Sequence, residues 1–351
     1  MTRGRAERLA WLIGCTGLLF ALLGWLMEPD VFAYAWLAAV SAWTGWPLGC
    51  LALLLTHALT GGRWGFAIRP YLLDGIGTLP LLLAAIIPLL FVWPELYPWL
   101  RPVGTGTFGN AFYLNAPFAI GRGIIYLIVW FGLAAFALRA ATRGVIATPF
   151  AAIGLLLLAF TVTFAAVDGT MSLDPHFASS SYGMMAGAES GLLALSVCVL
   201  AAALDPRVPP DAFDDVGRLL LGLLVLWAYL DFMQLLIVWN SNLPNEAPWY
   251  VARASHGWGT MAAVVAIGHF LLPFFALMSP RLRRTRLGLA SVAALLIAME
   301  ALRVWWLVLP ADHRFVGWID VAAMLAIAGL AAGVALRGPR LHTMSLQASH
   351  G

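Results

Sequence analysis

Long apolar runs recur along the whole chain, and short stretches rich in Pro, Gly or charged residues separate them. An α-helix needs roughly 20 apolar residues to cross the hydrocarbon core of a bilayer, and each run is about that long or longer. The pattern predicts ten transmembrane helices in one polytopic membrane domain over residues 1–351. The predicted spans lie near residues 9–27, 31–59, 71–93, 119–141, 148–170, 181–204, 216–240, 249–278, 287–309 and 315–336.

The amino-acid composition supports a membrane protein and argues against several other classes. Hydrophobic residues make up 62% of the chain and charged residues 11%, whereas a soluble domain carries about 25% charge. The net charge of +3 is too small to suggest nucleic-acid binding. The three cysteines, Cys15, Cys50 and Cys198, fall inside apolar runs without metal-site spacing, so they are predicted to be core residues.

The distribution of basic residues predicts the orientation. All 20 basic residues are Arg. If the loops alternate sides, 15 of these 20 fall on the side of both termini, while Arg101, Arg122, Arg253 and Arg314 fall on the other side and Arg303 falls within a span. The positive-inside rule then places both termini in the cytoplasm. The apolar run after Arg3, Arg5 and Arg8 has no small-residue cleavage pattern, so it is predicted to be an uncleaved first span.

Ionisable residues inside predicted spans are candidates for function, because they are costly in a membrane. Most of them fall in the outer half of the fifth to tenth spans. These are Asp168, Glu189, Asp231, His256, Glu300, Arg303 and Asp320, together with the polar Gln234 three residues after Asp231. The loop residue His176 lies near the same level. The pattern suggests an outer polar site that releases protons or admits a polar headgroup.

The inner half holds fewer such residues. His57, Asp74 and His269 are candidates for the intake of protons. Structural alternatives stay open: Glu300 and Arg303 can form an ion pair within one helix, acids at helix starts such as Asp74 and Asp320 suit the helix dipole, and the histidines can be core residues. A bis-histidine haem needs two facing histidines at one depth, and the inner pair His57 and His269 makes one such haem geometrically possible. No second pair exists, so haem is not expected, and no metal site is predicted.

Two segments predicted at the outer surface are dense in polar residues and in residues with special conformational or interfacial roles. They are residues 168–177 and 227–250. Pro and Asn fix turns, and Trp and Tyr anchor the membrane interface. An ordinary connecting loop needs neither, so the segments are candidates for packing against an extramembrane partner.

These two segments resemble signatures of a membrane subunit of bacterial alternative complex III, a quinol:cytochrome c oxidoreductase. The similar subunit is the smaller NrfD-like (polysulfide-reductase-like) one, of the ActF type. Residues 59–66, 78–81 and 95–99 are similar to it as well, and the resemblance runs from about Gly49 to Pro273. The chain departs from the family at Gly169, where Trp is usual, at Asp231, where a small polar residue is usual, and at Ser241-Asn242, where Gly-Asn is usual.

The resemblance implies an all-α fold of two four-helix bundles, formed by spans two to five and six to nine, with two flanking helices. It implies a haem-free subunit of the bacterial inner membrane, with no covalently bound cofactor, that takes part in quinone or quinol binding or in proton transfer. The implied partners are a second NrfD-like subunit, iron–sulfur and c-type haem subunits, and a terminal oxidase. A secondary transporter and a structural scaffold without chemistry of its own remain the alternatives.

Overall fold

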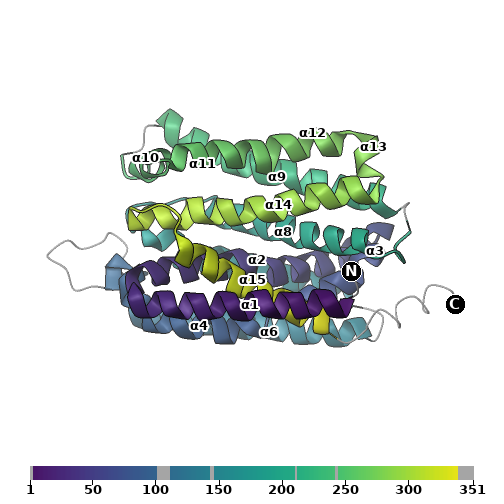
Figure 1. Cartoon of the computed structure of the whole chain (residues 1–351), viewed down its shortest axis with the longest axis horizontal. Coiled ribbons are helices and arrows are strands. Elements are labelled where there is room, and N and C mark those ends of the chain that lie inside the picture. Colours follow the sequence, from purple (N-terminus) through teal and green to yellow (C-terminus); the bar gives the residue numbers. More distant parts are fainter. Residues whose placement is uncertain (1–2, 101–110, 143–145, 210–211, 242–243, 339–351) are drawn as a thin grey trace.

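The protein is built from long helices that run side by side along its longest axis (Figure 1). The structure, a computed structural model, describes residues 3–100, 111–142, 146–209, 212–241 and 244–338. Within these residues every regular element is helical. The long helices are α1 (Arg3–Met27), α2 (Pro29–Thr60), α6 (Ala116–Thr142), α7 (Thr148–Gly169), α8 (Tyr182–Leu204), α9 (Ala212–Ser241), α14 (Arg286–Val308) and α15 (Trp318–Arg337).

Two further crossings consist of shorter pieces, and brief helices connect the long ones. The first is α3 (Arg63–Ile76) followed by α4 (Leu81–Phe91), and the second is α11 (Trp258–Val265), the π-helical segment η3 (Ala266–Leu271) and α12 (Leu272–Met278). The connecting helices are α5 (Trp93–Leu96), η1 (Pro98–Leu100), η2 (Met171–Leu173), α10 (Ala247–Ala254), α13 (Pro280–Arg283) and η4 (Leu309–Asp312).

The described residues contain nine helical segments that are long and apolar enough to cross a membrane, or ten when the bent pair α3–α4 counts as one span. The prediction of an all-α, multi-pass membrane protein is therefore confirmed. The apolar side chains on the outside of α1, α7 and α9 agree with this. In the apolar 18-residue stretch of each of these helices, only 22% of the residues are buried. Lipid is the solvent that such surfaces require.

Helices α2 and α8 form the centre of the molecule. In their apolar 18-residue stretches 72% and 67% of the residues are buried, and the two helices pack against each other. Figure 1 shows the layers around them: α9 and α11–α13 on one side of α8 and α14, and α1, α4 and α6 on the far side of α2 and α15. The first and last long helices, α1 and α15, pair closely and lean on α2.

The third crossing differs from the predicted span near residues 71–93. Helix α3 begins at Arg63, directly after Gly61 and Gly62, whose positive φ angles of 66° and 102° turn the chain. The crossing then bends by 43° between α3 and α4. Asp74 therefore lies near the end of α3 and not at a helix start, so the predicted dipole argument for Asp74 is wrong.

The eighth crossing also differs from the continuous helix predicted over residues 249–278. Helix α10 ends at Ala254, and α11 begins at Trp258. Between them His256 and Gly257 have φ angles of 49° and 88°, in the left-handed region that stops a helix. His256 is thus exposed in a break between two helices, and its predicted position two turns inside a span is wrong.

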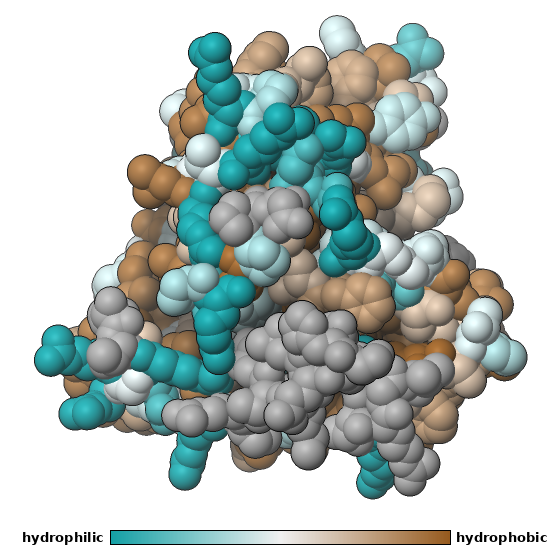
Figure 2. All heavy atoms as spheres, turned by 90° about the vertical axis from the view of Figure 1, so that its right-hand side faces the viewer, coloured by the Kyte–Doolittle hydropathy of each residue, from teal (hydrophilic) through white to brown (hydrophobic). Residues whose placement is uncertain are grey.

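One end of the molecule carries most of the described arginines, and we call it the arginine-rich end. It holds the start of α1, the α8–α9 connection and α13 (Figure 1). Figure 2 shows the hydrophilic side chains gathered on this end. Four of its arginines, Arg63, Arg207, Arg218 and Arg284, expose 58–77% of their side chains and pair with Asp205, Asp214 or Asp215.

Candidate functional site

A buried ionic cluster joins α8, α9 and α14, and we call it the Arg303 cluster. It consists of Glu189, Asp231, Glu300 and Arg303. The Arg303 side chain is 2% exposed, and its Nη2 lies 2.5 Å from Asp231 Oδ1 while its Nε lies 3.8 Å from Glu189 Oε1. Glu300, one turn before Arg303 on α14, is 6% exposed. The cluster brings together four residues that the sequence placed in the outer half of the membrane.

The partner of Arg303 differs from one alternative that the sequence left open. That alternative paired Glu300 with Arg303 on the same helix. Among the described residues the ion pairs of Arg303 are instead with α9 and α8, through Asp231 and Glu189. Glu300 therefore lies in the cluster as a buried carboxyl group without an ion pair of its own in the described part of the chain.

The cluster carries more acid than base. Three carboxyl groups surround one guanidinium, and transferring an unpaired charge out of water costs far more than transferring a neutral group. Glu189 Oε1, Arg303 Nε and Arg303 Nη1 also lack a hydrogen-bond partner within the described residues. An arrangement of this kind stabilises a proton on one carboxyl group.

Gln234 adds a neutral polar group one turn along α9 from Asp231. Its side-chain oxygen accepts hydrogen bonds from the hydroxyls of Ser179 and Ser181, in the segment that leads into α8. Gln234 is 5% exposed. These bonds tie the start of α8 to α9 beside the cluster.

Aromatic rings cover the other side of the guanidinium. Its Cζ lies 5.3 Å from the centroid of the Trp306 ring and 6.0 Å from that of Trp227. The Trp227 ring is also stacked on the His269 ring, with their centroids 4.3 Å apart. His269 belongs to the π-helical segment η3, and such bulges are frequent at functional sites. Through Trp227, the predicted inner residue His269 reaches the cluster by a chain of ring contacts.

Asp168 lies apart from the Arg303 cluster although the sequence grouped them. It ends α7 and forms a two-bond pair with Arg122 of α6, at 2.8 and 2.9 Å, and it accepts a bond of 2.7 Å from the Tyr126 hydroxyl. The Arg122 guanidinium also lies 3.7 Å from the centroid of the Tyr113 ring. We call Asp168, Arg122 and Tyr126 the Asp168 cluster.

The other predicted outer residues have structural positions. His176 is exposed on the loop before α8, where its backbone N–H donates to the Asp174 carboxylate. Asp320 accepts from the backbone N–H of Gly317 at 2.7 Å and caps α15. It also pairs with Arg314 at 2.5 Å. These contacts therefore support a structural role for Asp320 at the start of its helix.

The predicted inner residues do not form one group. The His57 ring donates from Nε2 to the Gly62 carbonyl at 3.0 Å, and it packs edge-on against Trp64 and Phe66. Those residues belong to the α2–α3 turn and α3, whereas His269 stacks on α9. The two rings therefore contact different elements and do not share neighbours.

Sequence reasoning missed Arg122 and Arg253, which it counted among outer loop residues. Arg122 is 8% exposed within α6, and Arg253 is 4% exposed in α10, over the Trp249 ring at 3.5 Å. A signal for Arg122 was available, because it falls inside the predicted span 119–141 and an arginine there needs a partner. No comparable signal pointed to Ser179 or Ser181, whose bonds depend on the approach of α9.

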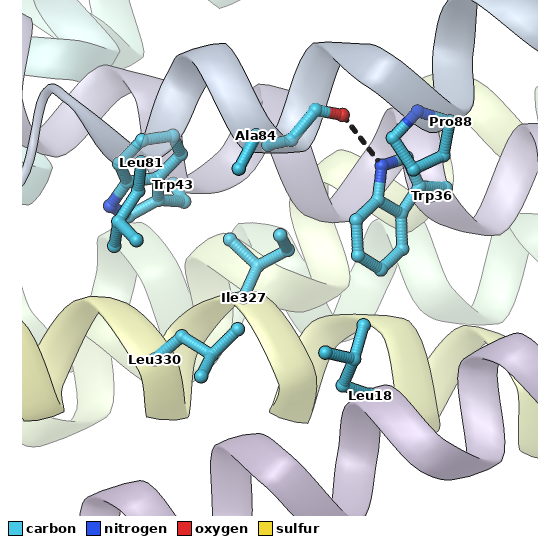
Figure 3. Close-up of a pocket in the computed structure, with 9 residues that line it drawn as sticks. Leu18, Trp36, Trp43, Leu81, Ala84, Pro88, Ile327 and Leu330 are labelled. Carbon is cyan, nitrogen blue, oxygen red and sulfur yellow. Dashed lines mark hydrogen bonds between the residues drawn. The ribbon is translucent and has the colours of Figure 1, made fainter.

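One cavity in the molecule is almost wholly apolar. Figure 3 shows it between α1, α2, α4 and α15, with Leu18, Trp36, Ile327 and Leu330 in its wall. Its volume is about 140 Å³. The Trp36 indole N–H donates to the Ala85 carbonyl at 2.8 Å. No ionisable residue lines this cavity in the described part of the chain, so it offers less chemistry than the Arg303 cluster.

Comparison with known proteins adds no identification: no protein-family model and no curated protein matches the chain.

Proposed function

We propose that the chain is a haem-free membrane subunit of a respiratory quinol:cytochrome c oxidoreductase-type complex, and that its Arg303 cluster holds and transfers a proton. The observation that carries the proposal is the imbalance of one buried arginine against three carboxyl groups from three helices. One guanidinium cannot neutralise three carboxylates, and uncompensated buried charge is strongly unfavourable. A proton that moves on and off the cluster resolves the imbalance.

Glu300 is the residue proposed to carry the exchanging proton. Glu189 and Asp231 each have Arg303 within 4 Å as a counter-charge, while Glu300 is buried without such an ion pair among the described residues. Asp231 is the most exposed member, with 34% of its side chain accessible, and would exchange protons with the outer surface. His269, in contact with Trp227, would supply protons from the inner side.

The respiratory assignment depends on the two segments that resemble the ActF-type subunit. These segments meet in space: the Phe177 ring stacks on the Trp249 ring at 4.5 Å, and Gln234 binds the serines that follow Phe177. Such a packed rim at the end opposite to the arginine-rich end supports a docking surface for partners. Redox centres would come from iron–sulfur and c-type haem subunits.

The same proposal includes the orientation and the bundle organisation. The arginine-rich end faces the cytoplasm of a bacterial inner membrane, with both termini on that side, by the positive-inside rule. Helices α2, α3–α4, α6 and α7 would form the first four-helix bundle, and α8, α9, α11–α12 and α14 the second. The pairing of α1 with α15 outside both sets supports their assignment as the flanking helices.

A secondary transporter is the second candidate, and the broken crossings favour it. Discontinuous helices line the substrate sites of many transporters, and both the 43° bend between α3 and α4 and the π-helical segment η3 interrupt crossings here. Copurification separates the two candidates. Copurified subunits with haem c or iron–sulfur clusters support the respiratory subunit. Solute transport by the isolated chain supports a transporter. A scaffold without chemistry of its own shows neither proton transfer nor solute transport.

The proton function is tested by neutralising the carboxyl groups one at a time. Glu189→Gln, Asp231→Asn and Glu300→Gln complexes are reconstituted in liposomes, and quinol oxidation and proton release are recorded together. Glu300→Gln is expected to slow proton release at least about tenfold, which corresponds to about 1.4 kcal/mol in the barrier. Asp215→Asn, at the exposed pair with Arg63, is the control. Full turnover and full proton release in all three variants would refute the proposal.

A further inference from the structure

At the arginine-rich end, one aspartate contacts three arginines where α9 begins and α12, α13 and α14 meet. Asp214, in the first turn of α9, accepts from Arg283 Nε at 2.8 Å and from Arg218 Nη2 at 2.9 Å. Arg284 Nη2 lies 3.4 Å from the same carboxylate. We call these four residues the Asp214 corner. One carboxylate cannot neutralise three guanidinium groups, so these four residues together carry excess positive charge.

Arg283 is the anchored member of the Asp214 corner. Its Nη1 donates to the Leu277 carbonyl near the end of α12 at 3.0 Å, and only 11% of its side chain is exposed. Its aliphatic part packs on Gly217 of α9, where an added Cβ atom would come within 2.3 Å of the Arg283 Cγ. Arg283 therefore joins α12 and α13 to α9 and fixes the place of the arginine that follows it.

Arg218 and Arg284 are the outward members, since 61% of each side chain is exposed. Their Nη2 atoms contact the same oxygen, Asp214 Oδ2, so the two guanidinium groups lie side by side although they come from α9 and from the turn after α13. Like charges held side by side repel each other, and an anion bound between them offsets the repulsion. Arg281, exposed in α13, adds positive charge beside them. Guanidinium groups pair strongly with phosphate oxygens.

Large apolar side chains are exposed directly beside these arginines in the sequence. Met278, Leu282 and Leu287 have exposed fractions of 55%, 45% and 79%. Leu282 belongs to α13, and the other two belong to α12 and α14, the helices on either side of it. Exposed apolar groups of this kind mark contact with a membrane. The corner therefore lies where lipid chains meet lipid headgroups, which is the level at which arginine side chains place their charge.

We propose that the Asp214 corner binds the phosphate of an anionic phospholipid, whose acyl chains lie on the exposed apolar side chains of α12 and α14. Basic pockets between membrane helices bind acidic headgroups of this kind. A free phosphate ion would make no use of Met278 and Leu287, and an acidic segment of a partner protein would match a polar rim better than these side chains. The site does not depend on the proposed proton function, because none of its residues belongs to the Arg303 cluster.

Lipid binding to the full-length protein in detergent micelles tests this site. The probe is dioleoyl phosphatidylglycerol. Native mass spectrometry counts the bound lipid, and thermal unfolding during a lipid titration gives the affinity. Dioleoyl phosphatidylcholine has the same chains but no net charge, and it is expected to bind at least about tenfold more weakly. Glycerol phosphate, which lacks the chains, is expected not to displace the bound lipid.

The decisive variant combines Arg218→Gln with Arg284→Gln and so removes both outward guanidinium groups. It is expected to weaken phosphatidylglycerol binding at least about tenfold, because each arginine contributes a charged contact to the headgroup. Arg5→Gln combined with Arg8→Gln is the matched control, since these arginines are exposed on α1, on the far side of the molecule from α9 (Figure 1). The control removes the same charge from the same end and should bind within about twofold of the natural protein, because distant surface charges are screened.

A single variant covers the case in which the double variant does not fold. Arg281→Gln removes an exposed arginine that has no ion pair in the described part of the chain, and it is expected to weaken binding about threefold. Thermal unfolding without added lipid shows whether each variant is folded. If the double variant is unfolded, unchanged binding in Arg281→Gln rejects the site.

Four further results would reject the site. Equal weakening by the two double variants would mean that the charge of the whole end accounts for binding. Equal affinity for phosphatidylcholine would mean that the chains alone are recognised. Displacement of the lipid by glycerol phosphate would indicate a site for free phosphate, and displacement by hexaglutamate at the same concentration would indicate an acidic protein partner in place of a lipid.

Discussion

Arg303 is the one cation described in the ionic cluster that joins three helices, and its removal is expected to destabilise the protein strongly. The partners of Arg303 in this cluster lie on α8 and α9. Arg303→Met leaves three carboxyl groups around an apolar side chain, and breaking a buried ion pair by removing one partner costs about 3–5 kcal/mol. Arg218→Met, at an i,i+4 surface pair with 61% of the arginine exposed, is the control and should unfold as the natural protein does. Unfolding in detergent micelles measures both variants, and equal stability of the two would contradict the burial argument.

The sequence could place Glu189, Asp231, Glu300 and Arg303 in the outer half of the membrane, but it could not predict that Arg303 reaches across to α9 instead of pairing with Glu300 on its own helix, or that Asp168 pairs with Arg122 of α6.

Asp205, between α8 and α9, makes the stability of the protein depend on pH. Hydrogen bonds from the Arg207 side chain, at 2.7 and 2.9 Å, hold the pKa of the Asp205 carboxyl well below its usual value, against the smaller opposing effect of burial. The Tyr71 hydroxyl adds a bond of 3.0 Å. Because the folded pKa is lower than the unfolded one, the stabilisation is fully present above the unfolded pKa of about 3.9 and is lost as pH falls through the folded pKa.

The expected result is a stability difference that depends on pH. Asp205→Asn should unfold more easily than the natural protein at pH 7. This difference should shrink below about pH 4, where the Asp205 carboxylate of the unfolded natural protein begins to bind protons while that of the folded protein does not. Thermal unfolding of both proteins in the same detergent at pH 7, 4 and 3 measures it. A difference that stays constant over this range would show that the Asp205 charge contributes nothing.

At the scale of elements, the count of long apolar helices followed from the sequence, while the breaks within two crossings did not. Apolar residues continue on both sides of each break, so periodicity and length carry no signal there. The break at His256 and Gly257 depends on backbone conformation, and that at residues 77–80 on a turn between two apolar helices. In a membrane such breaks persist where neighbouring groups satisfy the freed backbone.

Gly257→Ala tests whether the break before α11 is a fixed element. The φ angle of 88° at Gly257 is unfavourable for a residue with a Cβ, although the added atom would meet the Phe315 ring only at an ordinary 3.6 Å. The substitution is expected to destabilise the protein by about 1–2 kcal/mol through backbone strain. Gly222→Ala, within α9 and in open space, is the control and should stabilise by about 0.5–1 kcal/mol. If both variants shift unfolding in the same direction, the left-handed conformation at Gly257 is not required.

At the scale of the whole molecule, charge and burial divide the protein along its long axis. Arginines gather at the end shown in Figure 2, and they are paired there with acids near the surface. Toward the opposite end lie the Asp168 cluster and the stacked rings of Phe177 and Trp249. With the proposed site of proton release near one membrane surface and basic loops at the other, proton transfer would have a direction across the membrane.

The orientation itself leads to the last prediction. The arginine-rich end should face the cytoplasm, because excess Arg in short loops is retained on that side. A green fluorescent protein fused after Gly351 should therefore fluoresce, and alkaline phosphatase at the same place should be inactive, since the first folds in the cytoplasm and the second requires an oxidising compartment. Fusions after His313, in the loop between α14 and α15, should give the reverse pair. An active phosphatase at Gly351 together with a fluorescent fusion at His313 would show the inverse orientation. The Asp168 cluster and the exposed edge of the Arg303 cluster would then face the cytoplasm.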